Sequence, residues 1–258
     1  MLLAGFVVFF TLVLGLAAFG VNRILNPPAE VVAVPCPAPP TGHPATNATH
    51  TYAQTPPMTL QSSKSYTAVM CTTKGLIRIH LRATEAPKTV NDFVFLVNNG
   101  YYDGLTFHRV CPSATDSSCG PTTGGIHIAQ GGDPKGDGTG RGPGFTIPDE
   151  APVGKYTAGT VALARPANAD GSKIPNSSGG QIFINTGTNN FAPDYNLFGD
   201  VTSGLGVAQK LVKGDVMVWV AIETGVATSP APSASGGASP AAPPSASPAA
   251  ASPSPSPS

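Results

Sequence analysis

The sequence has little charge and no excess of either sign. Aspartate, glutamate, lysine and arginine make up 11% of its 258 residues, with 14 basic and 14 acidic side chains and a pI near 6.9. A protein that binds nucleic acid needs clustered lysine and arginine to neutralise phosphates. No basic stripe is visible, so we expect no nucleic-acid partner.

Cysteine is also scarce, and no two cysteines form a CxxC pair. Structural metal sites usually pair ligands two to four residues apart, so we expect neither a metal nor another cofactor. Cys111 and Cys119 bracket a short polar loop, which a disulfide between them would stiffen. Cys36 could then pair with Cys71, although four cysteines allow three connectivities. Disulfides imply an oxidising compartment, so we expect the folded part of the chain outside the cytoplasm.

Long apolar runs are lacking except at residues 2–21, twenty positions without a formal charge. A helix of that length can just span the hydrocarbon core of a bilayer, so residues 1–23 are predicted to be a transmembrane anchor or a signal peptide. The run is longer than a usual signal core and no small-residue cleavage site follows it, which favours the anchor. Arg23 follows the run and no lysine or arginine precedes it, so charge gives no support to an exported C-terminus.

Two further segments lack the apolar periodicity of a packed core. Residues 24–64 are rich in proline, threonine and alanine, which predicts an extended, semi-rigid stalk. Residues 227–258 are predicted to be a disordered tail, because positions 229–258 contain only serine, proline, alanine and glycine. One domain is left, at residues 65–226.

Strand patterns dominate this domain. Apolar and polar side chains alternate over residues 76–81, and a Thr-Thr-Lys-Gly turn joins them to an apolar run at 66–71. A helix is predicted from Pro87 to Gly100, where apolar residues recur at i, i+3, i+4 and i+7, and a second, short one at 205–212. The remaining strands are expected at 105–110, 127–130, 159–165, 180–186, 197–201 and 216–223. This pattern favours a closed β-barrel with helical plugs.

Five short motifs follow one another in the domain: Phe107-His108-Arg109-Val110, Gln130-Gly131-Gly132-Asp133-Pro134, Gly159-Thr160-Val161-Ala162, Gln181-Ile182-Phe183-Ile184-Asn185-Thr186 and Leu197-Phe198-Gly199. In this order they resemble the cyclophilin family of peptidyl-prolyl cis-trans isomerases, over about residues 66–223. The resemblance implies a mainly β fold, a closed eight-stranded antiparallel barrel capped by two α-helices. With the apolar N-terminus, it implies a bacterial, membrane-anchored isomerase.

The chemistry of that family explains the residue types. Rotation about an X-Pro bond must break amide resonance, with a barrier of about 18–20 kcal/mol, and needs no nucleophile, metal or general base. A hydrophobic pocket can hold the proline ring while a cation favours the twisted amide over the planar one. Arginine suits this role because it stays charged and presents rigid donors.

The resemblance assigns roles to particular residues. It makes Arg109 the catalytic cation, Gln130 a donor that orients the substrate backbone, and Phe183 the floor of the proline pocket. The other residues expected at the substrate are Phe107, His108, His127, Leu163, Ala164, Arg165, Gln181, Phe191 and Tyr195.

Several positions depart from the family pattern. The segment CPSATDSSCGPTTG is inserted after the arginine motif. The substituted positions are His127 for a phenylalanine, Arg165 for an asparagine, Phe191 for a tryptophan and Tyr195 for a histidine. These changes predict a working enzyme that is slow or selective.

We therefore expect a monomeric isomerase that acts on X-Pro bonds of exported proteins and assists their folding, with proline-containing polypeptides as partners. Its expected place is the bacterial cell membrane with the catalytic domain extracytoplasmic, or the medium if the N-terminus is cleaved. One alternative is a non-catalytic proline-binding or scaffolding module on the same fold, motivated by His127 and Arg165. Another is a wall-spanning structural protein whose Ser-Pro-Ala tail carries the function.

Overall fold

A β-hairpin begins the folded domain. Strand β1 (Lys64–Thr72) pairs antiparallel with β2 (Gly75–Leu81), and the register runs from Tyr66 opposite Leu81 to Thr72 opposite Gly75. Gly75 closes the turn with φ of 127°, a backbone conformation that side-chain-bearing residues rarely adopt. The predicted Thr-Thr-Lys-Gly turn is therefore present, with its glycine where the chain reverses.

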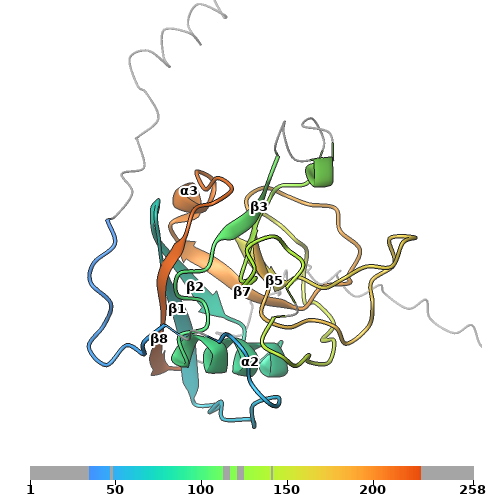
Figure 1. Ribbon diagram of the computed structural model, residues 1–258. Helices are drawn as coiled ribbons and strands as arrows, with labels where there is room; N and C mark the ends of the chain where they lie inside the picture. Colours follow the sequence, from blue (N-terminus) through green and yellow to red (C-terminus); the bar gives the residue numbers. More distant parts are fainter. Residues whose placement is uncertain (1–34, 47–48, 113–116, 121–124, 141, 228–258) are drawn as a thin grey trace, which may run out of the picture. The chain divides into compact units, whose positions relative to one another are not determined.

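The computed structural model describes residues 35–46, 49–112, 117–120, 125–140 and 142–227 (Figure 1). Eight antiparallel strands form one sheet in the order β3-β4-β6-β5-β7-β2-β1-β8. The strands that follow the hairpin are β3 (Phe107–Cys111), β4 (Ile128–Gly131), β5 (Thr160–Leu163), β6 (Ile182–Asn185), β7 (Leu197–Ser203) and β8 (Met217–Val226). All eight predicted strands are present.

The two edge strands of the sheet, β3 and β8, are hydrogen-bonded to each other around their first residues. Gly104 and Phe107 donate backbone hydrogen bonds to Met217 and Asp215, each at 2.8 Å, and an isolated bridge pairs Thr106 with Val216. Among the described residues, the sheet is an eight-stranded half-barrel whose edges meet over this short stretch. The sequence predicts a fully closed barrel. The structure shows its eight strands in one antiparallel sheet, with edges that meet over this short stretch.

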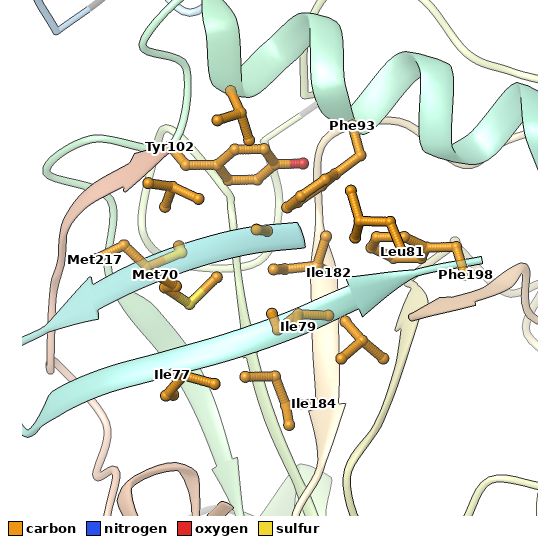
Figure 2. Packing of buried hydrophobic residues seen from close by; sticks show 14 of the residues in the cluster. Met70, Ile77, Ile79, Leu81, Phe93, Tyr102, Ile182, Ile184, Phe198 and Met217 are labelled. Atoms are coloured by element: carbon orange, nitrogen blue, oxygen red, sulfur yellow. The ribbon is translucent and has the colours of Figure 1, made fainter. Parts of the chain in front are cut away.

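Within the described residues, two α-helices accompany the sheet, α2 (Pro87–Asn98) and the shorter α3 (Leu205–Ala208), and they lie at opposite ends of it (Figure 1). Pro87 stands at the start of α2, where its missing N–H costs nothing. Phe93, from the buried face of α2, meets the rings of Tyr102 and Phe198 at centroid distances of 5.1 Å each. Figure 2 shows this contact above side chains of β1, β2 and β6, which together make the main core.

Residues of the predicted stalk lie against the domain. Cys36 forms a disulfide with Cys71 in β1, and Trp219 of β8 donates its indole N–H to the carbonyl of Pro37 at 3.1 Å. Farther along, the backbone N–H of Thr59 donates to the Asn91 side chain in α2 at 2.8 Å. This segment, blue in Figure 1, has neither helix nor strand before β1 within its described residues, yet it is fastened beside β1, β8 and α2.

No helix within the described residues is long and apolar enough to cross a membrane. The apolar run at 2–21 lies outside those residues, as does the predicted tail from residue 228 onward.

Candidate active site

Three neighbouring strands carry the residues that the sequence analysis places at the centre of the site. The register sets Arg109 of β3 opposite Gln130 of β4, and Gln130 opposite Phe183 of β6. Residues directly opposite in antiparallel strands point to the same face of a sheet. Accordingly, Nη1 of Arg109 donates to Oε1 of Gln130 at 3.3 Å. A cation, an amide and an aromatic ring therefore stand in a row across the sheet.

A row of side-chain amides continues from the arginine. Nε2 of Gln130 donates to Oε1 of Gln181 at 3.0 Å, and Nε2 of Gln181 donates to the carbonyls of Gly138 and Gly140 at 3.3 and 3.2 Å. Each amide is oriented by the next, so the chain of bonds fixes where the donors and acceptors of Gln130 point. A peptide that crosses this row would meet preset hydrogen-bonding partners.

The inserted loop approaches the arginine from the other side. Cys111 and Cys119 are joined by a disulfide, the pairing predicted from the sequence, and Cys119 ends the 3-10 helix η1 (Ser117–Cys119). Nε of Arg109 donates to Oγ of Ser118 at 2.9 Å, and Nη2 donates to the Ser118 carbonyl. The guanidinium thus lies between the loop and Gln130.

An aromatic cluster lies beside this row. The ring of Phe183, 3% exposed, is 5.9 Å from Phe191 and 5.1 Å from Tyr195, both edge-on. Phe191 and Tyr195 are half-buried and 5.5 Å apart. Edge-to-face contacts of this kind hold aromatic rings in defined orientations. The cluster supplies an apolar surface with one buried ring and two partly open ones.

Tyr156 completes the cluster and was not predicted. Its hydroxyl donates to the Tyr195 carbonyl at 2.9 Å and accepts from the Tyr195 backbone N–H at 3.0 Å. Its ring lies 5.6 Å from that of Phe191, and burial raises the pKa of its hydroxyl above the usual value. Tyr156 therefore anchors the segment that carries Tyr195. It stands in a glycine- and proline-rich loop without periodicity, which leaves no local signal of its role.

A groove of about 600 Å³ adjoins the amide row. Gln130, Gln181, Ala164 and Arg165 line it, together with glycines of the loop at 138–142. The guanidinium of Arg165, 7% exposed, donates from Nη1 to Asp149 at 2.5 Å and lies 3.7 Å from Asp194 through Nη2. Two carboxylates thus offset its charge at the wall of the groove.

Two other predicted residues lie behind the site. Phe107 and Leu163 are fully buried and belong to the main core. Phe107 lies on the strand that carries Arg109, and Leu163 ends β5 directly before Ala164. We therefore place them as backing for the site and find them outside the groove lining.

Histidine 108 is also buried, against the backbone of Gly138. A Cβ on Gly138 would come within 3.3 Å of Nε2 of His108, and neither ring nitrogen has a hydrogen-bond partner among the described residues. Burial lowers the pKa of His108 below its usual value, which keeps the ring neutral at pH 7. His108 thus packs beside the loop whose carbonyls orient Gln181.

His127 is half-buried and directly precedes β4. Its backbone N–H donates to Oδ1 of Asn189 at 2.8 Å, and its carbonyl accepts from Nδ2 of Asn189 at 2.8 Å. Its ring lies over Gly187, where an added Cβ would be 2.8 Å from Cγ of the imidazole. Asn189, which the sequence analysis did not single out, therefore fixes the backbone of this position.

Within the described residues, no group of three histidine, cysteine, aspartate or glutamate side chains could hold a metal ion. The chemistry available at the site is that of a guanidinium, oriented amides and an apolar aromatic surface.

Comparison with known proteins shows the family to which the chain belongs. Residues 67–227 match the family described as cyclophilin type peptidyl-prolyl cis-trans isomerase/CLD. Peptidyl-prolyl cis-trans isomerase B of Bacillus subtilis is 39% identical over 153 residues, which cover 57% of this chain and 90% of that protein. The probable isomerase B of Mycobacterium leprae is 30% identical over 204 residues, 76% of this chain and 60% of that protein.

The solved structures that resemble this chain include a cyclophilin-type isomerase of Cryptosporidium parvum. It is 24% identical with a TM-score of 0.49, and the match covers 62% of this chain and 98% of that one. The family match covers well over half of the chain. The chain belongs to the cyclophilin-type peptidyl-prolyl cis-trans isomerases, and its enzyme class is accordingly that of an isomerase.

Proposed function

We propose that the chain isomerises X-Pro bonds in polypeptides, with Arg109 as the catalytic cation. The observation that carries this proposal is the row of Arg109, Gln130 and Phe183 across β3, β4 and β6. A proline ring would rest on the apolar surface that Phe183, Phe191 and Tyr195 form together. Its peptide bond would then lie beside the guanidinium.

The chemical contribution of each group follows from its type. As the amide twists, the proline nitrogen loses resonance and gains basicity, and a fixed N–H donor beside it stabilises that state more than the planar one. Gln130, oriented by Gln181, would hold the substrate backbone. The apolar ring cluster excludes water from the bond and strengthens the interaction with the cation.

Substrate residues that precede the proline would occupy the groove past Ala164. Arg165 lines that groove, but Asp149 and Asp194 offset its charge. We therefore expect little preference for acidic side chains there. The ring of His127, which stands on Gly187, lies at the position where the family has a phenylalanine and would give a more polar contact with substrate.

The decisive test is the rate of cis-to-trans conversion of a proline tetrapeptide by the full chain. Arg109→Ala should lower kcat/KM about 100-fold, because removing one preorganised donor costs that order of rate. Arg109→Lys keeps the charge without the planar fork and should give an intermediate rate.

Arg78→Ala is the matched control. Arg78 stands on β2 in an exposed ion pair with Glu223 and should leave the rate within twofold. Equal rates for Arg109→Ala and the unaltered chain, both above the uncatalysed rate, would refute the catalytic role of Arg109. A rate of the unaltered chain no higher than the uncatalysed one would leave the non-catalytic proline-binding module as the better description.

We also propose that the substrates are exported proteins and that residues 1–23 tether the enzyme to the bacterial membrane. Two disulfides support an oxidising location, because reduced thiols prevail in the cytoplasm. The expected result is that the full chain sediments with membranes, while a chain lacking residues 1–34 is soluble. Blocked cysteines in cells would support export, and freely labelled cysteines in unreduced, denatured protein would contradict it.

A further inference from the structure

Ser118 of the inserted loop holds the guanidinium of Arg109 along one edge. Nε donates to the Ser118 hydroxyl at 2.9 Å and Nη2 donates to the Ser118 carbonyl. These two donors are parallel in the planar guanidinium, so both bonds together fix its plane as well as its position. Gln130 accepts from Nη1 at 3.3 Å. Arg109 is thus oriented from two sides.

Ser118 could not keep this position through its hydrogen bonds alone. It is exposed, and exposed hydrogen bonds contribute little net stability because water competes for the same groups. The neighbouring Cys119 restrains Ser118 further, because its disulfide joins η1 to Cys111, two residues after Arg109 on β3. Both sulfur atoms are therefore fixed to the strand that carries the arginine.

The bridge is also buried. Cys111 and Cys119 lie in the same apolar cluster as Ile128 and Phe183. Packing within this cluster restricts the bridge further, and the loop end that carries Ser118 inherits this rigidity. An arginine side chain has several rotatable bonds, and a cation that is already aimed stabilises a transition state without reorganising.

We propose that Ser118 is a positioning residue that aims the Arg109 guanidinium, and that the Cys111–Cys119 disulfide keeps Ser118 in place. The proposal rests on the proposed role of Arg109. In this proposal the inserted loop orients the Arg109 guanidinium toward the twisted amide of the substrate. Reduction of the Cys111–Cys119 disulfide would release this orientation.

Ser118→Ala removes the hydroxyl and keeps the carbonyl. In the full chain it should lower kcat roughly 3- to 10-fold, the worth of one such hydrogen bond, with KM unchanged within about twofold. Ser118→Thr retains the hydroxyl and should restore the rate. The effect of Ser118→Ala on kcat is also measured in the Arg109→Ala background, where it should vanish if Ser118 acts only through the arginine.

The two disulfides of the chain provide a matched pair of variants. Cys111→Ser/Cys119→Ser releases both contacts of Ser118 and should lower kcat by roughly tenfold. Cys36→Ser/Cys71→Ser removes the bridge outside the site and should leave kcat within about twofold when both variants are assayed well below their unfolding temperatures.

Each outcome decides one proposal. An unchanged kcat in Ser118→Ala, or a higher kcat once the Cys111–Cys119 bridge is removed, would overturn the positioning role while Arg109→Ala still lowers the rate. A loss in Ser118→Ala that persists at full size in the Arg109→Ala background would also overturn it. An unaffected rate in Arg109→Ala itself would instead defeat the proposed function.

Discussion

At the scale of single residues, Asp92 is a buried carboxyl group that lacks hydrogen-bond partners among the described residues. It lies on the inner face of α2, 1% exposed, and within the described residues neither carboxylate oxygen has a hydrogen-bond partner. The nearby Tyr102 hydroxyl is likewise buried without a partner there. Burial disfavours the charged carboxylate and raises the pKa of Asp92 to about 8.

The contribution of Asp92 to the stability of the protein should therefore fall as the pH rises. The folded-state pKa of Asp92 lies above its ordinary value of 3.8, so between these values the folded state binds more protons than the unfolded state. The stability that the protonated carboxyl permits is fully present below about pH 4 and is lost as the pH rises through 8. Asp92→Asn should remove this dependence and raise the free energy of unfolding at pH 8 by about 1–3 kcal/mol.

Urea unfolding at pH 5 and pH 8 measures this difference. Asp170→Asn serves as the control, because Asp170 is exposed and its pKa is lowered by hydrogen bonds from Ser172. Parallel pH profiles for Asp92→Asn and the unaltered chain would show that the carboxylate is solvated in the folded protein.

Single residues also show which parts of the site the sequence could predict. Arg109, Gln130 and Phe183 stand in short motifs, and strand pairing brings those motifs together. Ser118 and Tyr156 could not be predicted, because their contacts depend on how loops fold back over distant strands. The sequence predicts the residues of the row across β3, β4 and β6 better than those that hold them in place.

At the scale of elements, α2 depends on a residue from another part of the chain. Ala86, its N-cap, offers no side-chain hydrogen bond. Glu150 substitutes: its Oε1 accepts from the backbone N–H of Lys88 at 3.0 Å, and its Oε2 accepts from the N–H and hydroxyl of Thr89 at 2.8 and 2.7 Å. A carboxylate at this end also complements the helix dipole.

Glu150→Ala should lower the free energy of unfolding by about 1 kcal/mol, the usual cost of a lost helix cap. Glu150→Gln keeps the acceptor without the charge and should cost less. Glu85→Ala is the control, since Glu85 is exposed and pairs with Arg82 at only 3.6 Å. Equal thermal midpoints for Glu150→Ala and Glu85→Ala would contradict the capping role.

The predictability of elements follows the same physics. All eight strands and the start of α2 at Pro87 follow from local pattern, because alternation and turn residues act over a few positions. The cap of α2 comes from 61 residues away along the chain, so no local window contains it. The partial meeting of the sheet edges is likewise a long-range property.

At the scale of the whole molecule, the N-terminal segment is joined to the sheet far from its own position in sequence. The Cys36–Cys71 disulfide spans 35 residues, against 8 for Cys111–Cys119. Composition predicts an extended, semi-rigid stalk there. It cannot reveal which surface the segment contacts, since its disulfide, its hydrogen bonds, the His43–Asp103 pair and the ring contacts of Tyr52 all join it to residues far along the chain.

Removing the longer bridge should cost more stability than removing the shorter one. In the chain-entropy description Cys36→Ser/Cys71→Ser lowers the free energy of unfolding by about 3–4 kcal/mol, about 1 kcal/mol more than Cys111→Ser/Cys119→Ser. Thermal unfolding without reductant compares the two. The opposite order would indicate that the unfolded chain already keeps Cys36 close to Cys71.

The same bridge determines where a mechanical load would enter the protein. Tension applied upstream of residue 35 would pass through the sulfur atoms of Cys36 and Cys71 directly into β1, which has β2 on one side and β8 on the other. The residues between Cys36 and β1 would bear none of it, since they lie within a covalent ring. Pulling would load an internal strand of the sheet, which should resist far more strongly than a segment detached from the surface of the sheet.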